Sequence, residues 1–95
     1  MNDIVRQAIT ALDEKLGSTS FDGSAKFSIE GEGNVIIDSN GVRSGEEETD
    51  VTLTADAETF QEILSGELDP TSAFMGGRLR VEGDMGTAMR LSGLF

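Results

Sequence analysis

The sequence lacks most of the side chains on which enzymes depend. Its 95 residues include no cysteine, histidine, tryptophan or tyrosine, and only one proline. The absence of cysteine excludes disulfides, thiolate chemistry and sulfur-ligated metal sites. Without histidine, a serine nucleophile would need Lys15 or Lys26 as its base, and neither lies in a recognisable motif. The composition therefore argues against an enzyme, and we expect no cofactor.

Basic residues are also scarce. Seven Lys and Arg oppose eighteen Asp and Glu, which gives a net charge of -11. Affinity for nucleic acids comes largely from Lys and Arg contacts to phosphate, so we expect no nucleic-acid partner. An anionic membrane surface would repel the chain as a whole at long range.

Long apolar runs are missing as well. No segment approaches the ~18–20 consecutive apolar residues of a membrane span. Residues 1–16 carry charges throughout and contain no apolar core of a signal peptide. We therefore expect no stable membrane insertion and a cytoplasmic location. A length of 95 residues predicts one domain over 1–95, with a monomer favoured.

Periodicity and turn residues divide the chain into helices and strands. The first helix runs from a cap at Asn2 or Asp3 to a stop at Gly17. Cap residues at Asp56, Asp69 (followed by Pro70) and Asp84 begin three later helices. Alternating or apolar segments predict strands over 25–33, 34–38, 42–48, 50–56 and 78–82.

This order predicts an α+β domain. Most strands are grouped together in the chain, and helices lie at its ends and beside the last strand. One sheet, rich in antiparallel pairs, should carry the helices on one face. Within it, Phe27 and Ile29 should share one face of a half-buried strand, and Val51, Leu53, Leu79 and Val81 should point inward.

Several short motifs have structural explanations. GEGNVI at 31–36 lacks the third glycine and the following helix of a dinucleotide site, and a β-turn explains it better. The acidic residues around 38–50 have the wrong spacing for an EF-hand, and a hairpin turn at Asn40-Gly41 explains them. Gly76-Gly77-Arg78 ends a helix, so its dipole points the wrong way for phosphate.

An apolar cluster remains near the C-terminus. The predicted helices over one sheet bring together a set of large apolar side chains: Phe60, Leu64, Leu68, Phe74, Met75, Met85, Met89, Leu94 and Phe95. Methionines at helical spacing are more often core filler than the wall of a pocket. Met is also flexible and common on adaptable apolar surfaces. The spacing alone favours a packed core, and the alternative of a ligand-facing wall stays possible.

The segment that holds this cluster resembles a known family. DVTLT at 50–54 and DPTSAFMGGRLRVEGDM at 69–85 are similar to the conserved pattern of the sterol carrier protein 2 family. The front half, KFSIEGEGNVIID, looks like the compact, stand-alone bacterial members. The resemblance covers about residues 4–95.

The resemblance implies a fold and a function. It implies a five-stranded mixed sheet, largely antiparallel, and a hydrophobic tunnel between the sheet and the helices. The implied activity is non-catalytic binding and intracellular transfer of lipids such as fatty acids, fatty acyl-CoA, phospholipid or sterol-like molecules. By analogy, the tunnel would be lined by the following residues: Phe60, Leu64, Leu68, Phe74, Met75, Met85, Met89 and Phe95. The alternative is a structural or protein-interaction module of the same fold with a filled core.

Overall fold

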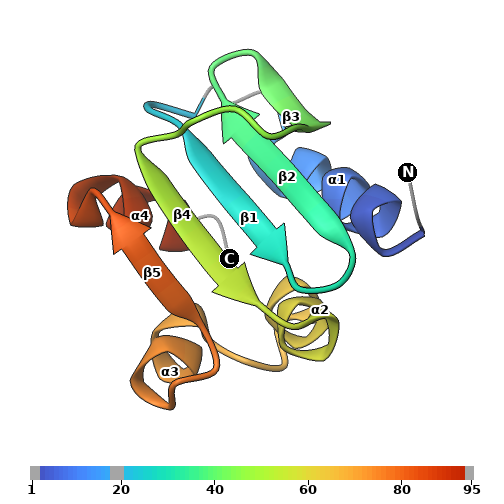
Figure 1. The fold of residues 1–95 in the computed structure, drawn as a ribbon, viewed down its shortest axis with the longest axis vertical. Helices are drawn as coiled ribbons and strands as arrows, with labels where there is room; N and C mark the ends of the chain where they lie inside the picture. The colour runs from blue at the N-terminus through green and yellow to red at the C-terminus, as the bar shows by residue number, and fades with distance from the viewer. Residues whose placement is uncertain (1–2, 18–20, 94–95) are drawn as a thin grey trace.

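The structure, a computed structural model, describes residues 3–17 and 21–93. The elements follow in the order α1 (Asp3–Leu16), β1 (Ala25–Ile29), β2 (Gly33–Asp38), β3 (Gly41–Ser44), β4 (Val51–Ala55), α2 (Ala57–Ser65), α3 (Pro70–Met75), β5 (Arg80–Gly83) and α4 (Met85–Ser92). Figure 1 shows this arrangement. In the described ranges, the helices are too short or too polar to span a bilayer.

The five strands form one mixed sheet in the order β3-β2-β1-β4-β5. Neighbouring strands are antiparallel, except that β1 and β4 at the centre run parallel, with Phe27 opposite Leu53. The α+β class and the five-stranded mixed sheet are therefore confirmed. The parallel pair forces the chain to cross over between β3 and β4, because parallel neighbours cannot be joined by a tight hairpin.

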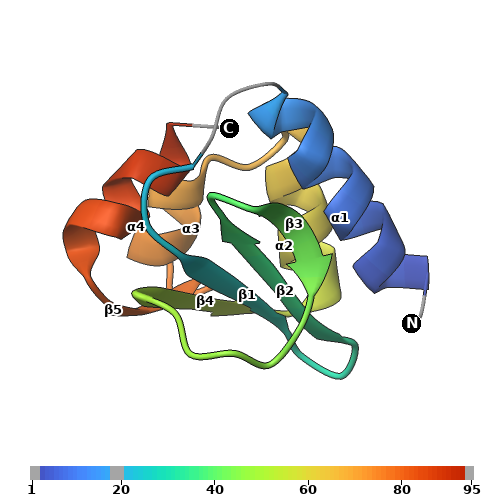
Figure 2. The ribbon, with the colours of Figure 1, turned by 90° about the horizontal axis from the view of Figure 1, so that it is seen from above.

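The helices cover one face of the sheet, as Figure 2 shows from above. Phe27 and Ile29 of β1, and Val51 and Leu53 of β4, are buried as predicted, while the residues between them are only partly covered. Ile36 lies on the opposite face and is also buried. The crossover passes close to it, since a side chain at Gly45 would meet the Ile36 Cγ1 at 3.2 Å.

The core lies between the sheet and α1, α2 and α4. Leu12 of α1 and Leu91 of α4 have no exposed surface. Phe60 of α2 packs edge-to-face on Phe27 of β1, with ring centroids 4.8 Å apart. Aromatic pairs of this geometry add roughly 0.5–1.5 kcal/mol beyond the burial of their area.

The caps predicted for the three later helices are present. The carboxylates of Asp56, Asp69 and Asp84 accept hydrogen bonds from backbone N–H groups three residues later, at 2.7, 3.1 and 3.0 Å. Gly17 and Gly66 follow α1 and α2 with positive φ, which explains why these helices end there. Asp3, one candidate cap of α1, is instead the first residue of the helix itself, and the other candidate, Asn2, lies outside the described residues.

The prediction of a strand over 42–48 is wrong in its extent. β3 ends at Ser44, and residues 45–49 continue as an irregular connection. Arg43 binds Asp38 and Glu47, with a 2.8 Å contact to the Glu47 carboxylate. These pairs hold the acidic run beside the sheet edge, where it serves as part of the crossover.

Candidate functional site: an apolar groove between two short helices

A groove of about 300 Å³ lies between α3, β5 and α4. Leu53 of β4, Leu79 and Val81 form its floor. Leu79 is buried, and Val81 is half-buried on the face that carries the helices. The inward direction predicted for Leu79 and Val81 explains their place in the floor, because side chains alternate along a strand.

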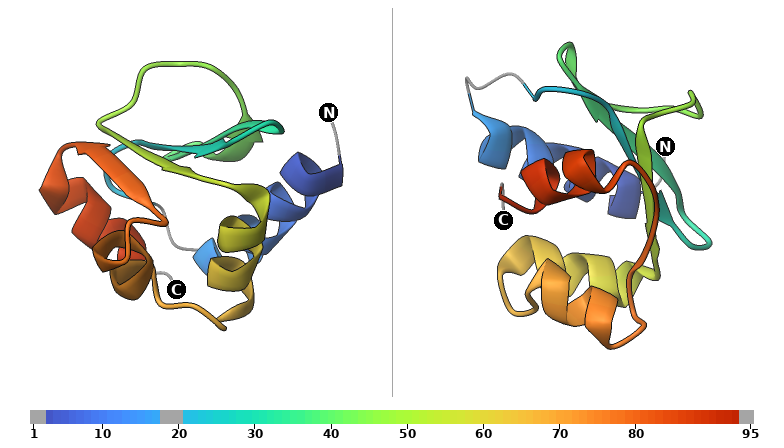
Figure 3. Two further views of the ribbon diagram at one scale, coloured as in Figure 1. Left: turned by 60° about the horizontal axis from the view of Figure 1, so that its bottom comes forward. Right: turned by 90° about the vertical axis from the view of Figure 1, so that its left-hand side faces the viewer.

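The walls of the groove come from the two short helices, which Figure 3 shows lying near each other beside β5. α3 contributes Pro70, Thr71 and Phe74, and α4 contributes Met85, Ala88, Met89 and Ser92. No charged residue contributes to this lining, and Thr71 and Ser92 alone supply side-chain hydroxyl groups. The groove therefore suits an apolar ligand, because almost nothing in it orients a polar one.

The walls expose an unusual amount of apolar surface. Phe74 is 43% exposed, Met85 51% and Met89 73%, and nearby Met75 is 80% exposed. Among the residues that the structure describes, these are the large hydrophobic side chains left exposed. An exposed apolar cluster of this kind marks an interaction site or a ligand-binding groove more often than scattered surface residues do.

Local sequence explains how the groove forms. A side chain at Gly83, which has a φ of 112°, would meet the Asp50 carbonyl oxygen at 2.4 Å. Only glycine fits this close approach, and the next residue donates from the Asp84 N–H to the same oxygen at 2.8 Å. The chain therefore turns sharply from β5 into α4, which brings Met85 and Met89 beside the strand.

A polar network fixes α4 at the edge of the groove. The Asp84 carboxylate accepts from the Thr87 hydroxyl, which in turn accepts from Arg90 at 3.0 Å. Arg90 also donates to the carbonyl of Asp22, in the segment before β1. The Thr87 hydroxyl and backbone N–H lower the pKa of Asp84 below its ordinary value of 3.8. The network therefore keeps this carboxylate charged and joins α4 to the body of the domain.

A second groove, of about 350 Å³, lies between α1 and α2. Phe60 and Leu64 line it from α2, opposite Ile4, Ala8 and Ala11 of α1. Phe60 is 2% exposed and belongs to the core, so it presents little surface to this groove. Two of the eight predicted lining residues therefore lie here rather than beside β5.

The other predicted site residues divide as follows. Phe74, Met85 and Met89 lie together in the α3–β5–α4 groove. Leu68 is half-buried against the core, and Met75 projects from the end of α3 outside both grooves. Phe95 lies outside the described residues.

Sequence reasoning missed the floor and the small residues of the walls. The sequence predicts Leu53, Leu79 and Val81 only as inward-facing strand residues, and Pro70 only as a helix start. The signal for them was the alternation of the last strand, which points Leu79 and Val81 toward the same side as the helices. The structure has an open groove here, and an enclosed tunnel stays a prediction.

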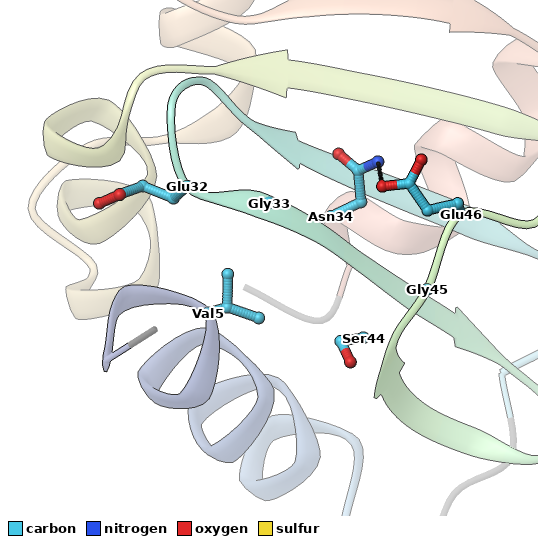
Figure 4. Close-up of a pocket in the computed structure, with 7 residues that line it drawn as sticks. All are labelled: Val5, Glu32, Gly33, Asn34, Ser44, Gly45 and Glu46. Atoms are coloured by element: carbon cyan, nitrogen blue, oxygen red, sulfur yellow. Dashed lines mark hydrogen bonds between the residues drawn. The ribbon is translucent and has the colours of Figure 1, made fainter. Parts of the chain in front are cut away.

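A third cavity, drawn in Figure 4, lies between the start of α1 and the β2–β3 hairpin. Val5 points from α1 toward β2, and the Asn34 amide donates to Glu46 at 3.4 Å. Glu32 also lies at its edge, so the cavity is acidic and mixed in polarity. Within residues 3–17 and 21–93, no three acidic side chains gather as they would to hold a metal ion.

Comparisons with known proteins identify the family. The family model described as "SCP-2 sterol transfer family" matches residues 3–95. The chain belongs to this family. Hydroxysteroid dehydrogenase-like protein 2 of Xenopus tropicalis is 37% identical over 93 residues, which cover 90% of this chain and 22% of that protein. The chain thus spans about a fifth of the length of the first relatives that it matches.

Solved structures show the same fold. Sterol carrier protein domain 2 of Helicoverpa armigera is 28% identical, with a TM-score of 0.78 over 99% of this chain and 89% of that one. Sterol carrier protein 2 of Aedes aegypti, solved in complex with palmitate, is 18% identical, with a TM-score of 0.79 over 98% and 94%. Both agree with the sheet and helices described above.

Proposed function

We propose that this chain binds the apolar part of a lipid in the α3–β5–α4 groove and carries it between sites without covalent chemistry. The observation that supports this most directly is the exposure of Phe74, Met85 and Met89 along an almost wholly apolar groove. A stable domain normally buries such residues. Membership of a sterol transfer family supports the same function.

The lining favours a lipid with a long apolar chain. Thr71 and Ser92 are the hydroxyl-bearing residues of the groove, so the polar head of the ligand remains outside it or at its rim. The fatty acid in the complex of the Aedes protein is a ligand of this kind. Fatty acids, their thioesters, phospholipids and sterol-like molecules share this chemistry, and we propose a long-chain fatty acid as the first ligand to test.

The groove is sufficient for useful affinity. Its volume of about 300 Å³ lies at the lower end of the ~300–1,000 Å³ of small-molecule sites. Burying one CH₂ group contributes ~0.8 kcal/mol, so a fully buried sixteen-carbon chain would offer roughly 12–13 kcal/mol before the costs of binding, and an open groove of this size realises only part of that. These costs leave an affinity on the order of micromolar. The methionines can adjust their rotamers to chains of different shape.

Two serines provide a matched test of which groove takes the lipid. Ser92 ends α4 and lines the α3–β5–α4 groove, whereas Ser65 ends α2 and lines the α1–α2 groove. Each hydroxyl donates to the carbonyl three residues earlier, at 3.0 and 3.1 Å. Replacing either serine by phenylalanine therefore removes the same hydrogen bond and fills a different groove.

The experiment measures displacement of a fluorescent fatty acid, with the melting temperature as a second readout. We expect palmitate to bind the wild type and raise its melting temperature. Ser92→Phe should weaken binding about tenfold or more, because a phenyl ring occupies the space of several methylene groups. Ser65→Phe should bind as the wild type does. The opposite result would place the lipid between α1 and α2.

Native mass spectrometry separates this function from the alternative of a filled interaction module. We expect the purified protein to retain a lipid or to accept added palmitate. A wild-type melting temperature unchanged by saturating fatty acids, together with no retained lipid, would support the alternative.

A further inference from the structure

Two apolar grooves lie on either side of one aromatic pair in the core. On its buried side the α3–β5–α4 groove is lined by Leu53 of β4, and the α1–α2 groove is lined by Phe60 of α2. Phe27 lies between these two residues. It is the partner of Leu53 in the parallel pair of β1 and β4, and it packs edge-to-face on Phe60. A row of three neighbouring side chains therefore separates the two grooves.

This row is thin, but it is closed. Neighbouring strands lie about 4.8 Å apart, so Phe27 lies close beside Leu53. The ring centroids of Phe27 and Phe60 are 4.8 Å apart, and both side chains are only 2% exposed. The pair thus fills the space behind each groove, as a close-packed interior requires. A chain that enters the α3–β5–α4 groove has to stop at this row.

The α1–α2 groove could hold the far end of an apolar chain. Ile4, Ala8, Ala11 and Leu64 supply apolar surface, and none of the described residues that line this groove is charged. It would add a volume of about 350 Å³ to the roughly 300 Å³ of the α3–β5–α4 groove. Joined, the two grooves would lie well within the ~300–1,000 Å³ of small-molecule sites instead of at its lower end.

We propose that the Phe27–Phe60 pair closes the inner end of the lipid groove and thereby sets the length of the apolar chain that the protein selects. This inference rests on the proposed function. Each methylene group that the groove buries should tighten binding about fourfold. Methylene groups beyond the pair remain in water and add nothing to the affinity. The affinity of the wild type should therefore rise with chain length and then level off.

Phe60→Ala tests the proposal, because it removes the ring that packs on Phe27 and lines the α1–α2 groove. Saturated fatty acids of about eight to eighteen carbons displace a fluorescent fatty acid, and each further methylene that the variant buries should tighten binding about fourfold. We expect the variant to bind the short chains as the wild type does and to level off at a longer chain. Ile37→Ala is the matched control, since Ile37 is fully buried but lines neither groove. It should level off where the wild type does.

Ser65→Phe shows where the longer chain goes, because Ser65 lines the α1–α2 groove. On its own, this substitution should leave binding unchanged at every chain length. Combined with Phe60→Ala, it should abolish the gain for long chains. A core that is merely loosened would not show this dependence. Phe60→Leu, which keeps more of the buried apolar surface, decides the question if Phe60→Ala does not fold, and it should give a smaller gain in the same direction.

Each outcome decides the proposal. It is overturned, and the lipid-binding function stands, if the affinity of the wild type keeps rising over the whole series or if both Phe60 variants level off where the wild type does. A gain that Ile37→Ala shares equally, or that Ser65→Phe leaves intact, also overturns it. A wild type that binds no fatty acid of any length overturns the proposed function as well.

Discussion

The two halves of the helical layer use their large side chains in opposite ways. In α1 and α2 the large apolar residues face the sheet, as Leu12 and Phe60 do, and both are buried. In α3 and α4 the buried positions include two alanines, Ala73 and Ala88. Leu91 of α4 is buried too, but the other large apolar residues of those helices, the phenylalanine and the three methionines, are exposed.

Under the proposed function, this difference separates stability from ligand binding. Burying a large side chain contributes roughly 1.5–3 kcal/mol to folding, and the α1–α2 half gains this contribution. The α3–β5–α4 half forgoes much of it and keeps an apolar surface available to a ligand. Regions of low local stability are the ones that ligand-binding proteins can move. We therefore expect substitutions in the first half to affect folding and substitutions in the second to affect binding.

The largest effect should come from Phe60→Ala compared with Met89→Ala. Phe60 is 2% exposed and packs on Phe27, so its removal leaves a cavity and should lower the free energy of unfolding by about 3–5 kcal/mol. Met89 is 73% exposed, and its removal should cost less than about 1 kcal/mol. Equilibrium urea denaturation measures both. Equal losses would show that the two halves share one core.

Gly83→Ala should have the next largest effect. An added Cβ meets the Asp50 carbonyl oxygen at 2.4 Å, and the φ of 112° is strained for alanine. We expect the free energy of unfolding to fall by about 2–3 kcal/mol. Lipid binding should also weaken, because the turn from β5 into α4 shapes the groove. Gly77→Ala is the control, since it has a φ of 78° but no atom within 4 Å of the added Cβ. Gly77→Ala should lower the free energy of unfolding by about 1 kcal/mol. Similar losses for the two variants would exclude the close contact as the cause.

Acid should weaken both halves through their helix caps. Thr59 and Thr87 lower the pKa of Asp56 and Asp84 below the ordinary value of 3.8 by donating from their side chains and N–H groups. The unfolded chain therefore takes up protons first as the pH falls. The stabilisation is complete above the unfolded pKa and is lost as the pH falls through the lower folded value.

Urea midpoints measured between pH 6 and pH 2 test this pH dependence. We expect them to fall in the acidic part of this range, and Asp84→Asn should make the decline shallower. Asp56→Asn should do the same in the other half. If the urea midpoint falls with pH as steeply in both variants as in the wild type, these two carboxylates do not contribute to the pH dependence of stability.

Local signals in the sequence were enough for most of the fold. The caps at Asp56, Asp69 and Asp84 and the stop at Gly66 act within a few residues, so they could be read without tertiary structure. The extent of β3 depended on a crossover that local patterns do not encode. Burial of Ile36 on the far face also required knowing where the acidic connection passes.

The candidate site was predictable only in part. Phe74, Met85 and Met89 stood out by residue type, and they do line one groove. Their exposure depends on how far α3 and α4 lie from the sheet, which is a property of packing and not of periodicity. Phe60 has the same spacing and chemistry as a groove residue, yet it is buried against Phe27. Spacing therefore identified apolar positions without separating core from wall.

The smallest effect should come from the ion pair that joins the two halves. Arg78, just before β5, contacts Glu62 of α2 at 2.9 Å, with side chains 42% and 28% exposed. Pairs this accessible to water gain little, because solvent screens them and both side chains lose rotamer freedom. Glu62→Gln should leave the urea midpoint within error of the wild type. Hydrogen exchange at residues 78–83 should become faster, because one tie between β5 and α2 is lost. A midpoint shift as large as that of Gly77→Ala would mean that this bridge, rather than the shared sheet, couples the binding half to the stable half.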